Sequence, residues 1–253
     1  MVYELKDTSL AEHLFEGWQE TLIWSCLQQV MGKIYVSDPE RPASAMAFVG
    51  CFCFYAGEPC RELVAEKPEG FIIMVPRDEA WAALIESCFP DAKRVTRYAI
   101  RKDTRFDRDA LRRMAAQVPE GYELREIDGE MYEKCLEDPV TRDFVSSFGS
   151  REKYLELGRG MVITKDGRIV SGASSYTRYK EGIEIEVDTA GDERRKHLAT
   201  AVCAALILRC LEEGLYPSWD AQNMNSVRLS QKFGYELDGE YTAYEVDSAC
   251  RTH

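Results

Sequence analysis

The sequence EVDTAGDERRKHLATAV, from Glu186 to Val202, combines three features in a short span. It ends an alternating strand, passes through an acidic loop and a basic cluster, and begins an apolar helix. The basic cluster is Arg194, Arg195, Lys196 and His197. A loop that leads from a strand into a helix N-terminus forms an anion site, because the first helical turn has unpaired N–H groups and partial positive charge. We therefore expect a phosphate or pyrophosphate here; the alternative is a basic, solvated first turn, which the helix dipole disfavours.

The segments on both sides of this stretch predict a complete α/β domain. LATAVCAALIL is apolar on most faces, which is typical of a central packed helix, and Gly214 follows its end. Before it, we expect strands over 122–128 and 181–189, short helices over 129–138 and 140–158, and a hairpin over 160–179. The hairpin turns at Asp166-Gly167, a type I′ signal. After it come a strand over 216–221, a helix over 225–234 and a strand over 235–246. The order is β-α-α-β-β-β-α-β-α-β.

The first half of the chain also mixes strands and helices. Ser9 and Glu12 form a capping-box pattern before an amphipathic run to about Met31. Strands are expected over 44–59, 71–76 and 94–103, with helices over 77–89, opened by Asp78, and 107–118. Pro119 and Gly121 interrupt the pattern. We therefore expect two domains, 1–118 and 121–253.

Composition excludes several classes of function. The formal net charge is −12, with 45% hydrophobic and 30% charged residues, which argues against nucleic-acid or anionic-membrane binding. The N-terminal sequence lacks the pattern of a signal peptide, and no apolar run is long enough to span a bilayer. The nine cysteines form no CxxC pair and the three histidines have no ligand spacing, so we expect free thiols, a cytoplasmic location and no metal.

Two motifs together resemble the GNAT superfamily of N-acetyltransferases. RRKHLAT, from Arg194, resembles the R-x-x-G-x-G/A motif that holds the pyrophosphate of acetyl-CoA, and the second motif is Asn223, Ser226, Leu229 and Gly234-Tyr235. The resemblance implies a mixed, mostly antiparallel sheet flanked by helices, and a degenerate GNAT-like domain in the N-terminal half. It implies acetyl-CoA as cosubstrate, held by residues Val187, Asp188, Thr189, Arg194, Arg195, Lys196, His197, Leu198, Ala199, Thr200, Asn223 and Ser226.

Two residues depart from the motifs of this superfamily. His197 stands where the first motif has its first glycine, which allows the backbone to approach phosphate closely. Ser230 stands where many members carry a tyrosine that protonates the departing thiolate. Asn223 is expected to bind the pantetheine amides, to cap the following helix, or to do both.

The candidate catalytic groups lie on the strand IEIEV and in the final strand. The alternation of IEIEV and the residue after it places Glu184, Glu186 and Asp188 on one face, so Glu184 or Glu186 is the candidate general base. The alternative is a solvated acidic face, and a bulge would change the parity. The resemblance implies that main-chain N–H groups over 186–188 hold the acetyl carbonyl. Tyr241 is the candidate acid, with Tyr235 and Tyr244 as further choices.

These features predict an N-acetyltransferase that acts on a small-molecule amine as a monomer or homodimer. Acceptor contacts are expected over 135–154, because helices after the first strand commonly wall that side in this superfamily. Two alternatives stay open. One is a non-catalytic CoA-binding or sensing protein, and the other is a structural partner domain whose basic cluster binds protein carboxylates.

Overall fold

The computed structural model describes residues 1–247, and it divides into two compact units. One unit comprises residues 1–97 together with the chain from Glu240 onward, and the other comprises Tyr98–Gly239. Each unit contains its own sheet flanked by helices, so the α/β class expected from the sequence is confirmed.

The unit of residues 98–239 is built on a five-stranded sheet in the order β11-β10-β9-β8-β7. Its strands are β7 (Tyr122–Glu126), β8 (Gly160–Lys165), β9 (Arg168–Tyr179), β10 (Gly182–Thr189) and β11 (Tyr216–Ser218). Neighbours are antiparallel except β10 and β11, which are parallel and connected by α8 (Leu198–Glu212). The expected hairpin is confirmed, with Asp166 and Gly167 both at positive φ, as a type I′ turn requires.

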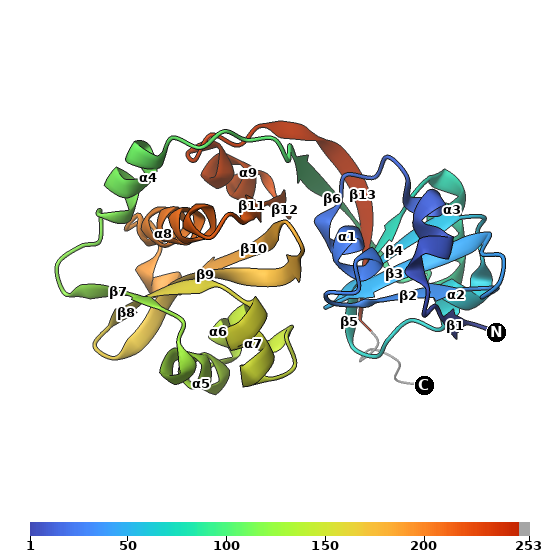
Figure 1. Cartoon of the computed structure of the whole chain (residues 1–253), viewed down its shortest axis with the longest axis horizontal. Coiled ribbons are helices and arrows are strands. Elements are labelled where there is room, and N and C mark those ends of the chain that lie inside the picture. The colour runs from blue at the N-terminus through green and yellow to red at the C-terminus, as the bar shows by residue number, and fades with distance from the viewer. Residues whose placement is uncertain (248–253) are drawn as a thin grey trace. The chain divides into compact units, whose positions relative to one another are not determined.

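Helices cover both faces of this sheet (Figure 1). The helix α8 lies on one face, and α5 (Gly129–Glu137), α6 (Pro139–Ser146) and α7 (Arg151–Leu157) lie on the other. The prediction of a single helix over 140–158 is wrong. The segment forms the two helices α6 and α7, which are separated around Gly149 at φ 75°. Helix α6 approaches β9 closely, since a Cβ at Gly172 would lie 2.3 Å from the Phe144 ring.

The apolar face of β10 forms the core with α8. Ile183, Ile185 and Val187 join the cluster that contains the buried residues of α8, as the alternation predicted. The helix buries most of its residues, including Cys203 and Cys210, so it is the central element that its sequence indicated. Burial of this much apolar surface is the main stabilising term for the unit.

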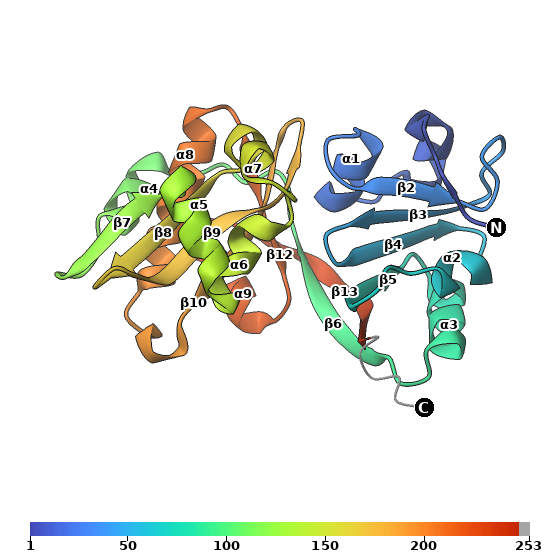
Figure 2. The same cartoon turned by 90° about the horizontal axis from the view of Figure 1, so that it is seen from below.

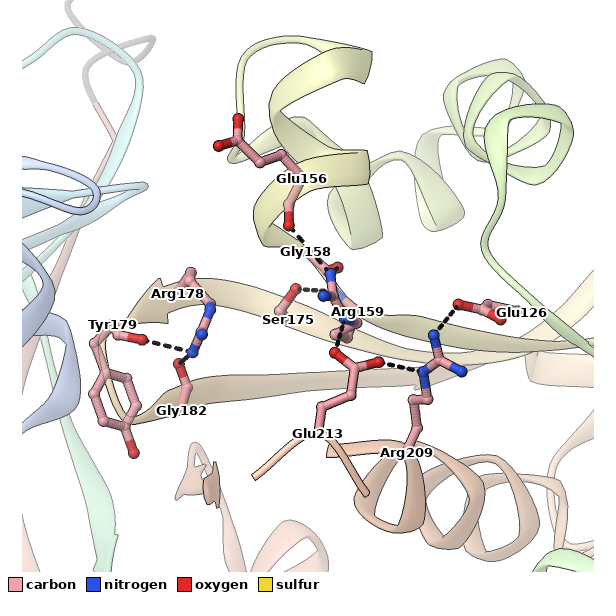
Figure 3. A network of polar contacts seen from close by, with 10 residues as sticks. All are labelled: Glu126, Glu156, Gly158, Arg159, Ser175, Arg178, Tyr179, Gly182, Arg209 and Glu213. Carbon is pink, nitrogen blue, oxygen red and sulfur yellow. Dashed lines mark hydrogen bonds and ion pairs between the residues drawn. The ribbon is translucent and has the colours of Figure 1, made fainter. Parts of the chain in front are cut away.

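The C-terminal end of α8 is fastened by a chain of ion pairs (Figure 3). Glu213 accepts from Arg159 at 2.6 Å and from Arg209 at 2.5 Å, and Arg209 lies 3.3 Å from Glu126. Arg159, which precedes β8, also donates to the carbonyl of Glu156 at the end of α7. These contacts connect α8 to β7, β8 and α7 at the end of the helix opposite the basic cluster.

The first unit is built on an eight-stranded sheet in the order β1-β2-β3-β4-β5-β13-β6-β12, of which β12 is described below with the second unit. Its strands are β1 (Tyr3–Glu4), β2 (Lys33–Val36), β3 (Ser44–Val49), β4 (Phe52–Gly57), β5 (Phe71–Pro76), β6 (Lys93–Ile100) and β13 (Leu237–Asp247). The helices are η1 (Thr8–Phe15), α1 (Thr21–Leu27), α2 (Arg61–Ala65) and α3 (Glu79–Cys88). As expected, Asp78 caps α3 through its side chain. Figure 2 shows the strands of this unit side by side.

Two expectations for this unit are wrong. The helix expected from Ser9 to Met31 is broken into η1 and α1 around Gly17, which has φ 73°, and the capping side chain is Asp7. The strand expected over 44–59 is a hairpin of β3 and β4 that turns at Gly50. The apolar residues continue through that turn, so their pattern does not mark it.

The compact units do not coincide with the expected division at residues 118–121. The helix α4 (Arg108–Ala115) packs against α8 and buries Leu111 in the second unit's core. The strand β13 pairs with β5 and buries Tyr244 and Val246 in the first unit's core. The second unit also includes β12 (Asp220–Ala221) and α9 (Met224–Gln231). Each unit is therefore completed by chain from the other half of the sequence.

Candidate functional site

The N-terminus of α8 is the centre of the candidate site. His197 is its N-cap residue in the left-handed region (φ 63°), and no side chain caps the helix. By contrast, Asn223, Asp107 and Asp128 cap α9, α4 and α5 through their side chains. The first-turn N–H groups of Leu198, Ala199 and Thr200 therefore retain the capacity to bind an anion.

The loop before α8 carries backbone strain. Arg195 and His197 both have φ near 64°, a region that residues other than glycine rarely adopt. Both side chains are exposed. Strained residues persist where the surroundings over-determine them, and they concentrate at binding sites. The motif glycine that His197 replaces thus corresponds to a position that requires the left-handed conformation.

Two basic residues of the cluster, and one lysine from outside it, have different environments near the N-terminus of α8. The Arg194 side chain is 66% exposed, and its Nε donates to the Thr189 carbonyl at 3.2 Å. The Lys196 Nζ lies 2.6 Å from Glu193, so its charge is largely neutralised within the loop. Lys232, at the end of α9, places its Nζ 3.3 Å from the Thr200 Oγ1. Sequence analysis missed Lys232, because its approach to α8 depends on how α9 packs.

The strand β10 is paired on both sides only at its start. It pairs with β11 over Gly182–Glu184, whereas its pairing with β9 continues to Thr189. After Ser218 the chain leaves β10, and β12 pairs instead with Tyr98 and Ala99 of β6. Within residues 1–247, the edge of β10 that includes Val187, Asp188 and Thr189 has no ladder partner opposite β9. Thr189 uses its N–H and its carbonyl locally, toward the Asp188 Oδ1 and the Arg194 Nε, whereas the main chain at Val187 can still pair with an extended ligand.

The acidic face of β10 lies on the side of the sheet away from α8, and it becomes more exposed toward Asp188, whose side chain is 46% exposed. Glu184 is 4% exposed and Glu186 is half-buried. Burial, together with the charges of Asp143 and Asp188, raises the pKa of Glu186 to about 8. The Glu186 Oε2 is buried without a hydrogen-bond partner in the described chain. A carboxyl group with these properties is neutral below about pH 8 and ready to exchange a proton.

A bulge does occur beside Glu184, but it leaves the parity of β10 unchanged. Glu184 is opposite Thr177 and Ile185 is opposite Ser175, so Tyr176 of β9 is the extra residue. Because the insertion is in β9, the acidic and apolar residues of β10 still alternate.

Asn223 and Ser226 lie at the start of α9. The Asn223 side chain accepts from the N–H groups of Asn225 and Ser226, which is the N-cap role. Its amide NH₂ remains a donor. The Ser226 Oγ accepts from the Trp219 indole N–H at 3.0 Å. Trp219 is buried in the core of the unit, where it packs against its neighbours.

The candidate acids lie in three different environments. Tyr241 belongs to the other compact unit, where its hydroxyl accepts from the Arg97 Nε at 3.1 Å. Tyr244 is in that unit as well and donates to Glu86. Tyr235 is buried, and its hydroxyl donates to the Pro217 carbonyl. Ser230 is also buried and donates to the Val227 carbonyl.

A pocket lies beneath α6 at the ends of β9 and β10. The lining includes Thr141 and Phe144 of α6 and its N-cap residue Asp138, Ser171 of β9, and Asp188 and Arg194. The pocket therefore adjoins the β10 face that carries Glu186 and involves the segment 135–154, where acceptor contacts were expected. Among residues 1–247, no cluster of candidate ligands could hold a metal ion, the cysteines are free thiols, and no helix has the length and apolarity to cross a membrane.

Comparison with known proteins identifies what this architecture resembles. The family model of the GNAT acetyltransferases matches residues 12–244. The uncharacterised N-acetyltransferase YdfB of Bacillus subtilis (strain 168) is 23% identical and is covered over 95% of its length, for 94% of this chain. The crystal structure of a GCN5-related N-acetyltransferase-like protein from Streptococcus suis 89/1591 is 46% identical, with a TM-score of 0.91, covering 95% of this chain and 98% of that one. A tandem GNAT protein from the clavulanic acid biosynthesis pathway has the same fold at a TM-score of 0.52 and 11% identity, over 98% of both chains.

Proposed function

The chain belongs to the GNAT acetyltransferase family, and we propose that it transfers the acetyl group of acetyl-CoA to the amine of a small molecule. The single observation that carries this proposal is the uncapped N-terminus of α8 beside the unpaired edge of β10. The two features offer helix N–H groups for a pyrophosphate and an extended main-chain edge for pantetheine amides.

The residues that would hold acetyl-CoA follow from these contacts. The N–H groups of Leu198, Ala199 and Thr200 would face the pyrophosphate, and Arg194 would supply an exposed cation. Asn223 has a free NH₂ group for a pantetheine carbonyl. Acetyl-CoA supplies the activated acetyl thioester, and the outward N–H groups of β10 over 186–188 polarise its carbonyl.

Glu186 is the general base in this proposal. The amine must lose a proton as it attacks, and a buried carboxylate with a pKa of about 8 is a well-matched acceptor near neutral pH. Glu184 lies two residues earlier on the same face and is the second candidate. The pocket beneath α6 would hold the acceptor, with Asp138 and Asp188 facing a substrate ammonium group.

One observation favours a second candidate function. Ser230 occupies the position of the thiolate acid in many family members, and its hydroxyl donates to the Val227 carbonyl. A protein that binds acetyl-CoA without transferring the acetyl group would be consistent with this. The thiolate of CoA is a good leaving group, however, so an acid at this position is not essential for turnover.

Calorimetry with acetyl-CoA, followed by turnover on a panel of small amines, tests the proposal. The wild-type chain should bind acetyl-CoA, and Arg194→Ala should weaken binding by about 1–3 kcal/mol, the loss of a charge-assisted hydrogen bond. Arg151→Ala is the matched control and should bind normally. It removes an exposed arginine of α7 that pairs with Glu133 of α5, on the sheet face opposite α8. Binding without turnover on any amine would favour the second candidate.

A further inference from the structure

We propose that Glu193 is a positioning residue that holds the loop of residues 190–197 in the conformation that binds the pyrophosphate; this inference rests on the proposed function. Glu193 ends the short helix η2 (Gly191–Glu193), which lies between β10 and the basic cluster. Although acidic, it is buried at 7% exposure within a loop whose neighbouring residues are mostly exposed.

Three donors from three parts of the unit meet the Glu193 carboxylate. Tyr122 of β7 donates its hydroxyl at 2.5 Å, Lys196 donates at 2.6 Å, and Lys165 of β8 donates at 3.2 Å. The two ammonium groups also lie over the Tyr122 ring, at 5.0 Å for Lys165 and 5.8 Å for Lys196. Glu193 therefore connects the loop to the sheet at one end and to the residue before the N-cap at the other.

This arrangement explains how two strained residues persist on either side of Lys196 in an exposed loop. Lys196 lies between Arg195 and His197, which both have positive φ. Fixing the Lys196 side chain to Glu193 and to the Tyr122 hydroxyl limits the backbone between them. The N–H groups at the start of α8 are then directed before an anion arrives, which lowers the entropy cost of binding.

Electrostatics and positioning make opposite predictions for the loss of this carboxylate. Glu193 is firmly ionised, since hydrogen bonds from Lys196, Tyr122 and Lys165 hold its pKa at about 2. Removing its charge makes the loop more positive, which by itself strengthens the binding of a polyanion. Weaker binding after Glu193→Gln would therefore identify a positional role.

Asp192 provides a matched control in the same helical turn. It is 62% exposed and pairs with Arg168 at 3.0 Å. The substitutions Asp192→Asn and Glu193→Gln change the charge equally, but only the second breaks the contacts with Tyr122, Lys165 and Lys196. Tyr122→Phe is the complementary variant, because it removes one contact without changing the charge.

Acetyl-CoA titration and amide hydrogen exchange of the four proteins test the inference. We expect Glu193→Gln to raise the Kd and the KM for acetyl-CoA about tenfold with kcat at saturation retained, and Tyr122→Phe to do so about threefold. Asp192→Asn should bind as tightly as wild type or more tightly. In the free protein, the amides of residues 194–200 should exchange faster in Glu193→Gln than in Asp192→Asn.

The two readouts separate the inference from the function on which it rests. Unchanged or tighter acetyl-CoA binding by Glu193→Gln, or exchange rates equal to those of wild type, would overturn the positioning role. Absence of acetyl-CoA binding by the wild-type chain would instead overturn the proposed function. A fall in kcat alone, with KM unchanged, would also contradict positioning, because the loop contacts the cosubstrate away from the reacting atoms. If Glu193→Gln fails to fold, the Tyr122→Phe variant carries the same test.

Discussion

At the scale of single residues, Glu186 combines an unfavourable environment with a chemical use. Its carboxyl group is buried beside Asp143 and Asp188, and burial is the larger cause of its raised pKa. Ionising this carboxyl group is less favourable in the folded protein than in the unfolded chain, where water solvates the charge. A residue kept at such a cost is a functional candidate, whereas a structural carboxylate would be expected to have a cationic partner.

We predict that Glu186→Gln lowers kcat at least about a hundredfold, the usual worth of a general base. Because the base acts when deprotonated, wild-type activity should rise as pH increases through about 8, and the variant should lose this limb. The measurement is a pH–rate profile with a fixed acceptor. Full activity with an unchanged profile would leave Glu184 or water as the proton acceptor.

The same substitution should increase stability, which a purely structural role would not do. A folded pKa above the unfolded value means that Glu186 contributes most below the unfolded pKa, and that this contribution is lost as pH rises through about 8. Glutamine resembles the neutral acid at every pH. Glu186→Gln should therefore be more stable than wild type by on the order of 1–3 kcal/mol at pH 7 and nearly equal to it at pH 4. Denaturant titrations at the two pH values measure this difference.

At the scale of elements, α8 is stabilised unequally at its two ends. At its C-terminus, Glu213 forms ion pairs with Arg159 and Arg209, which connect the helix to its surroundings. Its N-terminus has no side-chain cap and gathers positive charge, both of which disfavour an isolated helix. The missing cap and the unfavourable positive charge both lie at the loop where an anion is expected. The end of the helix that is less stable is therefore the end at the proposed site.

His197→Gly should therefore stabilise the free protein by about 1 kcal/mol, since glycine adopts φ 63° without the penalty of an L side chain. His197→Ala, which removes the ring but retains the strain, should show no such gain in thermal unfolding. We expect acetyl-CoA binding by the glycine variant to be retained at pH 8. Binding that strengthens at pH 5.5 in wild type, and not in either variant, would show that the imidazolium donates to phosphate instead.

At the scale of the whole molecule, the two units repeat one strand pattern. In each, antiparallel neighbours lead to a parallel pair joined through a helix, which is β4 with β5 in one unit and β10 with β11 in the other. This repetition supports our proposal that the N-terminal half is a degenerate copy of the C-terminal half. The chain nevertheless does not divide between copies, because β13 completes the first sheet and α4 completes the second core.

A fragment of residues 1–118 should accordingly fail to fold by itself. It lacks β13, which pairs with β5 and supplies Tyr244 and Val246 to the core. We expect no cooperative thermal transition for this fragment, whereas coexpression with residues 119–253 should restore one. Circular dichroism and limited proteolysis provide the measurement. A cooperative, protease-resistant fragment 1–118 would mean that the sequence boundary is also the folding boundary.

Local signals in the sequence determined much of the second unit and indicated the residues proposed for the site. The Asp166-Gly167 turn, the alternation of IEIEV and the apolar body of α8 each depend on neighbours within a few residues, and each predicted its element. The motif residues at Arg194 and Asn223 indicated the family for the same reason. Hydrogen bonding within turns and the periodicity of side chains are local properties, so one sequence is enough to predict them.

Tertiary structure alone decided which of these residues have unusual chemistry. The alternation of β10 predicted the face on which Glu186 lies, but only tertiary burial, with Asp143 and Asp188 nearby, raises its pKa to about 8. The sequence shows Lys196 only as one of several cations, whereas the structure pairs it with Glu193, whose carboxylate also accepts from Tyr122 and Lys165. The placement of β13 beside β5 joins residues more than 150 positions apart. Desolvation, ion pairing and strand choice depend on which distant segments exclude water from one another, and no local pattern records that.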